Sequence, residues 1–349
     1  MALPSSSFQI VSHESPAADA GFVPKGAYPL VSIGIPTYNR ADRFLQEALR
    51  SALEQTYPNI EVIVSDNCSK DDTERVVQGF RSPRLRYFRH ETNIGANNNF
   101  NFCLEQARGE YFQLLQDDDT IDRDYISTCL EAAAYDTRFG IIRTGTRLIN
   151  SQGDVAAELP NCAAGLALDE CLLAWFGNRT SFYLCSTLFN TAGLREMGGF
   201  GSRHNLFQDV MAEVRLAARL GRVDVREAKA SFRKHDGEMT FAARVGHWCE
   251  DSIQLLDILR SLTGEKGRLI EREGMRFLAG LNYKRARAVR SPVQRLHAYF
   301  TVYRAFRYQW PPPKGHLVAL LAESAPGVAL RAGLRRLRGV SREGGQARL

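Results

Sequence analysis

The 349-residue sequence lacks the cysteine patterns of disulfide-bonded and zinc-binding proteins. Its seven cysteines are an odd number, and no two of them form a C-x-x-C pair. This argues against a disulfide framework and against a zinc site, and it fits a reducing compartment. Neither the basic nor the apolar region of a signal peptide is visible, and no apolar run is long enough to cross a bilayer. We therefore expect a cytoplasmic protein.

Two glycine-rich phosphate-binding motifs are also missing. No G-x-G-x-x-G follows the first predicted strand at residues 30–36, and no G-x-x-x-x-G-K-[ST] occurs anywhere in the chain. These glycines let a backbone approach the phosphates of a dinucleotide or a nucleoside triphosphate closely. Their absence weakens two function classes, the dinucleotide-binding oxidoreductases and the P-loop NTPases.

Acidic residues are scarce near the C-terminus. Residues 260–349 hold 19 Lys and Arg but only 5 Asp and Glu, a net charge of +14, so the preceding part carries −8 of the overall +6. An acidic body with a basic tail predicts a cation site in the first part and an anionic partner for the second, either nucleic acid or a membrane surface. No zinc finger, basic zipper or RNA-recognition motif supports nucleic acid.

Beyond the break at Pro311-Pro312-Pro313, the segments 317–321 and 328–337 carry leucines on one side, with Arg331, Arg335, Arg336 and Arg338 among them, as in helices at a membrane interface. We expect a protein peripheral on the inner face of the membrane. The alternative is a solvated basic face on helices that pack against the rest of the chain.

Apolar runs and helical spacing alternate over the first half of the sequence. Strands are predicted at 30–36, 60–66, 85–88 and 111–115, with helices between them, and Pro36 is expected to end the first strand. Less legible strands follow at 141–144, 147–149 and 181–190 and near 232–236, with helices at 166–176 and from 208. Short loops between alternating elements predict an α/β fold, a mostly parallel Rossmann-like sheet flanked by helices. We expect a leader (1–27), a domain at 28–245 and a helical basic region at 246–349.

Three adjacent carboxylates, Asp117, Asp118 and Asp119, follow the strand at 111–115. They repel one another unless a cation lies between them, and carboxylate oxygens are preferred ligands of Mg²⁺ and Mn²⁺. In open α/β sheets ligands bind beyond the carboxyl ends of the strands. A metal site and a solvated acidic turn are both consistent with the triplet alone. Asp66, at the end of the strand 60–66, is expected to face the same crevice.

An ordered series of motifs over about residues 28–245 resembles the family 2 inverting glycosyltransferases, which have the GT-A fold. The series comprises Pro36-Thr37-Tyr38-Asn39-Arg40 after the first strand, Asp66-Asn67 before a Ser-x-Asp-x-Thr turn, Asn93-Ile94-Gly95, the acidic triplet, Gly198-Gly199-Phe200, Asp209, and Arg233 and His235 with Thr240 beyond.

The resemblance implies a role for each motif. The segment Pro36 to Arg40, together with Asp66, Asn67, Asn93, Gly95, Asp117 and Asp118, would hold the nucleotide-sugar donor. Asp66 would accept from N3–H of uracil or thymine. Asp118, Asp119 and His235 would hold Mg²⁺ or Mn²⁺ on the diphosphate. Asp209 would be the general base that takes the proton from the acceptor hydroxyl, and one displacement would invert the anomeric carbon.

The sequence departs from the family pattern at two positions. The motif common in the family is Asp-x-Asp-Asp. In this chain Gln116 occupies its first position and Asp118 its third. The resemblance therefore makes Asp118 the favoured metal ligand and assigns Asp117 to the ribose. A shifted register would use Asp117 and Asp119. The family often has Glu-Asp where this chain has Gln208-Asp209. The predicted base, Asp209, is present, but the neighbouring Gln208 lacks the negative charge of the usual Glu.

The sequence therefore predicts transfer of a sugar, most simply from a UDP-sugar, to a glycan or lipid-linked acceptor in cell-surface polysaccharide synthesis. One alternative is a nucleotide-sugar-binding module without catalysis, although Asp209 and the acidic triplet are present. Another is a sugar-1-phosphate nucleotidyltransferase, which needs a glycine-rich loop where Pro36-Thr37-Tyr38-Asn39 stands.

Overall fold

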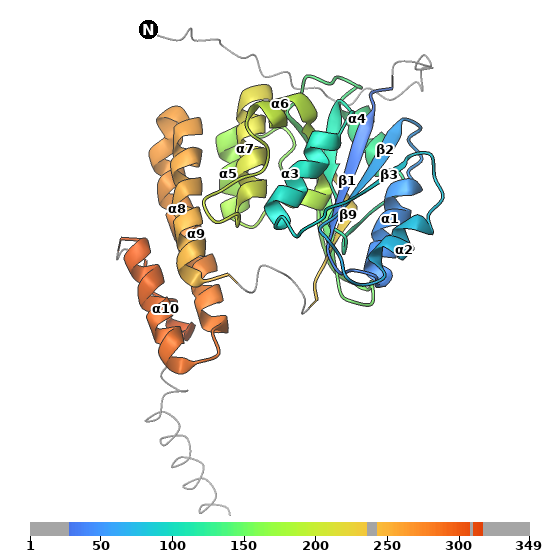
Figure 1. Cartoon of the computed structure of the whole chain (residues 1–349). Helices are drawn as coiled ribbons and strands as arrows, with labels where there is room; N and C mark the ends of the chain where they lie inside the picture. The colour runs from blue at the N-terminus through green and yellow to red at the C-terminus, as the bar shows by residue number, and fades with distance from the viewer. Residues whose placement is uncertain (1–27, 236–242, 308–309, 317–349) are drawn as a thin grey trace, which may run out of the picture.

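The computed structural model describes residues 28–235, 243–307 and 310–316. The chain has an α/β fold in which helices flank a mixed sheet, and a helical bundle follows (Figure 1). The strands are β1 Val31–Thr37, β2 Ile60–Asp66, β3 Leu85–Arg89, β4 Tyr111–Leu114, β5 Thr120–Ile121, β6 Ile141–Ile149, β7 Val155–Leu159, β8 Thr187–Asn190 and β9 Arg222–Arg233. The helices are α1 Arg43–Leu53, α2 Thr73–Gln78, α3 Ala96–Gln106, α4 Tyr125–Ala132, α5 Leu168–Phe176, α6 Thr191–Glu196, α7 Gln208–Leu220, α8 Val245–Leu262, α9 Gly267–Ala288 and α10 Pro292–Ala305.

The sheet has two halves of different character. Its strand order is β3-β2-β1-β4-β8-β6-β9-β5, with β7 on β6. The first four strands run parallel, as the alternation of strands and helices predicts. From β8 onward the pairing is mixed: β4–β8, β6–β8, β6–β7 and β5–β9 are antiparallel, and β6–β9 is parallel. The parallel half brings the carboxyl ends of β1, β2 and β4 to one edge.

Strand β1 lies at the centre of the parallel half and is fully buried. Contrary to the sequence prediction, Pro36 does not end it, because the strand continues to Thr37. Its pairing with β4 stops at Gly34, while its pairing with β2 extends to Thr37. Proline, which has no N–H to donate, is therefore tolerated where β1 has only one paired neighbour.

Two apolar cores cover the two faces of the parallel half. One packs Val31, Ile33 and Ile35 of β1 against α1 and α4, and α1 contributes Leu45, Ala48 and Leu49 at helical spacing. The other packs Phe112 and Leu114 of β4 against α3, α6 and α7. Gly109 allows the chain to enter β4, since a Cβ there would lie 2.4 Å from the Leu30 carbonyl oxygen. With both faces covered, the strand tips stay free to carry polar side chains.

Helix α7 joins the sheet to the bundle. Ala212 and Leu216 belong to the core on the sheet, while Val210, Met211 and Val214 belong to a third core with α5, α8, α9 and α10. The expected boundary at 245/246 therefore lies beside a continuous core, and the bundle packs directly on the sheet domain (Figure 1).

The second half of the sheet departs most from the sequence predictions. The segments 141–144 and 147–149 form one strand, β6, and β9 is a 12-residue strand that the sequence revealed only near its end. The predicted strand 181–190 keeps only Thr187–Asn190, and β7 and α6 were not predicted. The charges of β9 hide its burial, because Asp224 pairs with Arg143 of β6 and with Arg222 of the same strand, while Arg226 and Glu227 are exposed.

Among the described residues, no helix combines the length and apolarity that a membrane span requires. The expected leader at 1–27, the leucine-rich segments 317–321 and 328–337, and Thr240 lie outside the described residues.

Candidate active site

The tips of β1 and β4 meet at a buried hydrogen bond. Thr37 Oγ1, at the end of β1, donates to Asp117 Oδ2 at 2.7 Å. The two residues are 80 positions apart and come together because β1 and β4 are adjacent parallel strands. Burial, followed by the charge of Asp118, raises the pKa of Asp117 to about 7, although Arg40 and the Thr37 hydroxyl act in the opposite direction.

Arg40 supplies a positive charge between two of the acids. Its Nε lies 3.5 Å from Asp117 Oδ1, and one terminal nitrogen lies 3.7 Å from Asp118 Oδ2. The Nε is buried without a hydrogen-bond partner. The cation that the acidic triplet requires is thus provided in part by the loop after β1.

Asp118 faces His235, which follows β9. Its Oδ2 lies 2.9 Å from His235 Nε2. Arg233, two residues before the histidine, donates from Nε to the Asp118 carbonyl oxygen at 2.8 Å and pairs with Glu47 of α1 at 2.5 Å. The Arg233 side chain is buried and lies over the Phe44 ring. These bonds fix the histidine beside the acidic turn, although 117 residues separate the two in sequence.

Asp119 points into the protein and not toward Arg40. Its Oδ1 accepts from the Arg233 backbone N–H at 2.8 Å, and the Cys185 thiol also bonds to it. The carboxyl is almost fully buried, and burial raises its pKa well above the usual value, followed by the charge of Asp118. These contacts favour a structural role, holding the acidic turn to β9, over the predicted role as a metal ligand.

The donor set suits a divalent cation that also has ligands from a substrate. Among residues 28–235, 243–307 and 310–316, no group of three or more Asp, Glu, His or Cys side chains is arranged to hold a metal ion. Asp118 and His235 supply one carboxylate oxygen and one imidazole nitrogen in close proximity. Such a pair fits Mg²⁺ or Mn²⁺ when diphosphate oxygens complete the coordination, as is common for ions bound with substrate phosphates.

The loops after β1 and β2 are hydrogen-bonded to each other. The Asn39 N–H donates to Ser69 Oγ and the Lys70 N–H donates to Asn39 Oδ1, both at 2.8 Å. The Arg40 N–H donates to Thr73 Oγ1 at 3.0 Å. Asn39 has φ = 49°, a conformation that Asn tolerates better than most residues. Pro36 is buried in β1, and Tyr38 is exposed at the rim.

Asp66, the last residue of β2, is fully buried. Its Oδ1 accepts from the Ser69 N–H at 2.8 Å, and its Oδ2 accepts from the Tyr87 hydroxyl at 2.7 Å, with Arg89 Nε at 3.8 Å. The predicted bond to a base N3–H would use a remaining lone pair. The sequence did not predict the Tyr87 contact, because Tyr87 lies in β3 and belongs to none of the motifs.

Asn67, Asn93 and Gly95 form one connected turn beside Asp66. Asn67 Nδ2 donates to Asn93 Oδ1 at 3.0 Å, and Asn67 Oδ1 accepts from the Ile94 N–H at 2.8 Å. Gly95, at φ = 84°, donates its N–H to Asn93 Oδ1. These three predicted residues therefore lie together.

The Gly198-Gly199-Phe200 turn is tied to α3. Both glycines have positive φ, and a Cβ on Gly199 would lie 2.3 Å from Asn101 Oδ1. The Phe200 carbonyl accepts from the side-chain amides of Asn97 and Asn101 at 3.0 and 2.9 Å. The turn thus fixes the start of the loop that leads to α7.

Asp209 lies in the first turn of α7, where the helix dipole favours a carboxylate. Its Oδ1 accepts from the Val210 N–H at 2.8 Å. Burial raises its pKa to about 6, opposed by the backbone N–H groups. No contact joins Asp209 to the acidic turn directly, as expected if a sugar lies between a base and a donor diphosphate.

A buried charge cluster below Asp209 escaped the sequence prediction. Glu213, one turn further along α7, faces Arg143 of β6 at 3.8 Å, and Arg143 pairs with Asp224 of β9 at 3.2 Å. All three are buried. Burial raises the pKa of Glu213 well above its usual value. Each residue is separately unremarkable in sequence, and only the packing of β6, β9 and α7 brings them together.

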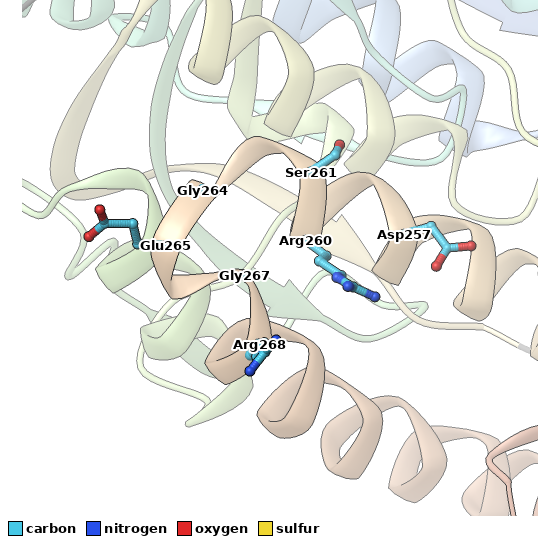
Figure 2. A pocket seen from close by; sticks show the side chains of 7 residues that line it. All are labelled: Asp257, Arg260, Ser261, Gly264, Glu265, Gly267 and Arg268. Carbon is cyan, nitrogen blue, oxygen red and sulfur yellow. The ribbon is translucent and has the colours of Figure 1, made fainter.

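A surface hollow lies elsewhere, at the turn between α8 and α9. It encloses about 700 Å³ and is lined by Asp257, Arg260, Ser261, Gly264, Glu265, Gly267 and Arg268 (Figure 2). None of the predicted site residues lines it. Its charged groups of both signs are typical of solvated surface.

Comparison with known proteins fits this geometry. Residues 32–150 match the model of the family described as glycosyl transferase family 2. About a third of the chain is therefore similar to the family 2 glycosyltransferases. The match includes the loop after β1, Asp66, Asn93, Gly95 and the acidic turn, and it ends before Asp209 and His235.

One curated relative of this chain is a GalNAc(5)-diNAcBac-PP-undecaprenol beta-1,3-glucosyltransferase from Campylobacter jejuni. It is 36% identical over 135 residues, which cover 37% of this chain and 42% of the relative. The first curated relatives are matched over only 13% to 42% of their own lengths.

Solved structures share the GT-A fold over most of the chain. TarS 1–349 of S. aureus in complex with UDP-GlcNAc has a TM-score of 0.60 at 18% identity and covers 82% of both chains. The mannosyltransferase PcManGT from Pyrobaculum calidifontis, in complex with GDP-Man and Mn²⁺, has a TM-score of 0.51 at 19% identity, covering 89% of this chain and 80% of the neighbour. The predicted fold is confirmed.

Proposed function

We propose that this protein is a glycosyltransferase that moves a sugar from a UDP-sugar to a glycan or lipid-linked acceptor, with inversion, in the synthesis of a cell-surface polysaccharide. The observation that carries the proposal is the convergence of Thr37, Asp117, Asp118 and His235 at the strand tips, with Asp209 on a separate helix N-terminus. The UDP-GlcNAc complex of TarS and the lipid-linked acceptor named in the Campylobacter relative support the donor and acceptor classes.

The nucleoside would lie over the loops after β1 and β2. Asp66, held by Tyr87 and Ser69, would accept from the base, and the Asn67–Asn93–Gly95 turn would form the wall beside it. Asp117, oriented by Thr37, would accept from the ribose hydroxyls. These contacts would position the donor before any chemistry takes place.

Asp118 and His235 would hold Mg²⁺ or Mn²⁺ at the diphosphate, and that ion would neutralise charge on the departing UDP. Arg40 lies between Asp117 and Asp118 and would add a second positive charge. Arg233 keeps His235 in place through its bonds to Asp118 and Glu47.

Asp209 would take the proton from the acceptor hydroxyl as the oxygen attacks the anomeric carbon. The new C–O bond forms as the bond to the diphosphate breaks, so a single displacement inverts the configuration. With a pKa raised to about 6, Asp209 is ionised at neutral pH and is a stronger base than an ordinary carboxylate.

The test begins with a panel of nucleotide sugars screened by thermal shift in Mn²⁺, which identifies the donor. Release of nucleoside diphosphate is then measured for the wild type, Asp209→Asn and Asp118→Ala. We expect both variants to lose turnover while keeping the wild-type melting temperature to within a few degrees. Undiminished turnover in both variants would contradict the proposed mechanism.

A further inference from the structure

The outer face of α10 carries apolar side chains that no other described part of the chain covers. Val293, Leu296 and Phe300 are 79%, 58% and 56% exposed. Steps of three and four residues place them on one side of the helix. They are three of only six large hydrophobic side chains that are exposed among the described residues, so the clustering is a property of this helix and not of the whole surface.

The opposite face of α10 is also apolar. Ala298, Tyr299, Val302 and Phe306 are buried in the core with α8 and α9. A helix that is apolar on both faces is ordinarily enclosed by neighbours on both sides. In Figure 1, however, α10 lies at the outside of the bundle, with α8 and α9 between it and the sheet domain. One of its two apolar faces therefore lacks a neighbour among residues 28–235, 243–307 and 310–316.

The charge around this face has one sign. From residue 274 to residue 316 the sequence holds nine Lys and Arg and no Asp or Glu. Lys284, Arg287, Arg290 and Arg304 are exposed on α9, α10 and the turn between them. Glu271, on the preceding turns of α9, faces Arg307 at 3.6 Å. The segment thus offers cations and no acid along the rest of α9, along α10 and in the turn between them.

We infer that the outer face of α10 docks on an anionic lipid bilayer. Apolar side chains that enter the interface while neighbouring basic residues meet lipid phosphates are the pattern of interfacial helices. Basic residues near an anionic surface strengthen such binding. A second copy of this chain would bring the same cations against themselves, which disfavours self-association through this face. The docking surface is a folded helix within the bundle and does not require the leucine-rich segments beyond residue 316.

The experiment is sedimentation of the full-length chain with vesicles of phosphatidylcholine containing about 30% phosphatidylglycerol. We expect binding that weakens at least tenfold at about 0.5 M NaCl, where surface charges are screened, and on pure phosphatidylcholine. Leu296→Ser with Phe300→Ser should lower the partition coefficient at least tenfold. Val155→Ser, on β7 and as exposed as Leu296 at 58%, should bind like the wild type.

Two results would overturn the inference. One is wild-type protein that stays in solution with anionic vesicles, or a double variant that binds them like the wild type. The other is a wild-type dimer, detected by light scattering, that the double variant dissociates while vesicle binding is absent. Because Asp209→Asn should bind vesicles like the wild type, failure of the catalytic proposal and failure of this inference can be told apart.

Discussion

At the strand tips, Asp117, Asp118 and Asp119 each contact a donor or cation of the same chain, whereas residues 274–316 hold nine cations and no acid. The first region is acidic in sequence and balanced in structure. Arg40, Arg233 and His235 come from loops and strands as far as 117 residues away. The second region is basic in sequence and stays so in structure, beside exposed apolar residues.

The difference separates two ways in which charge serves function. Buried charges at the sheet are costly unless paired, so their arrangement is fixed and suits chemistry on a small substrate. Exposed charges on α9 and α10 remain hydrated and are free to meet an external anionic surface. Substitutions in the two regions should therefore have effects of different size and kind.

The largest effect is expected at the catalytic base. Asp209→Asn keeps the shape of the side chain and removes its ability to accept a proton, so we expect turnover to fall about 10²- to 10⁴-fold. Turnover is measured as nucleoside diphosphate released with the donor identified by screening. A loss below tenfold, with unchanged unfolding, would mean that another group acts as the base.

A pair of arginines tests the contrast in stability. Arg143→Leu leaves Glu213 buried without its cation and removes one of the two arginines that pair with Asp224, and should lower the free energy of unfolding by about 3–5 kcal/mol. Arg304→Leu, on exposed α10, should change it by less than about 0.5 kcal/mol. Urea unfolding measures both. Equal effects would show that burial does not distinguish the two regions.

The pH dependence of kcat/KM should report the raised pKa of Asp209. The carboxylate form is the active one, so kcat/KM should rise about tenfold per pH unit below pH 6 and level off above it. The scan covers about pH 4.5 to 8, and it requires a donor and an acceptor that do not titrate within that range. A limb centred near pH 4 would show that Asp209 is not desolvated.

A smaller effect than that of Arg143→Leu is expected at Glu213. Its folded pKa is raised above the unfolded value, so its favourable contribution is present below the unfolded pKa and is lost as pH rises toward the folded pKa. Because glutamine does not ionise, Glu213→Gln does not lose this stability as the pH rises. The variant should match the wild type near pH 4.5 and exceed it by about 1 kcal/mol at pH 8. A variant that is less stable at pH 8 would mean that the charge of Glu213 is needed opposite Arg143.

The parallel half of the fold could be predicted because its signals are local. Apolar runs such as Ile60–Asp66 end in acids, and the sheet topology then brings those ends together. Strand β9 could not be predicted, because some of its charges are compensated by residues distant in sequence: Asp224 by Arg143, and Arg233 by Glu47. The sequence shows that β9 contains charged residues, but it does not show which residues pair with them in the fold.

The candidate site was predictable to the same degree. The motifs named the donor-side residues, and the structure brings Thr37 to Asp117, Asn67 to Asn93 and Asp118 to His235. It gives Asp119 a contact with Cys185 and Asp66 a contact with Tyr87 that no motif predicts. The membrane prediction rested on the leucine-rich tail, while α10 now provides a surface that can be tested.

The central claim is that the strand tips bind a nucleoside diphosphate with a divalent cation and that Asp209 acts after binding. Calorimetric titration of UDP in Mn²⁺ tests it most directly. The account predicts equal affinity for the wild type and Asp209→Asn, and at least tenfold weaker binding for Asp118→Asn. It would be contradicted if the wild type bound UDP equally well without Mn²⁺, or if Asp118→Asn bound like the wild type.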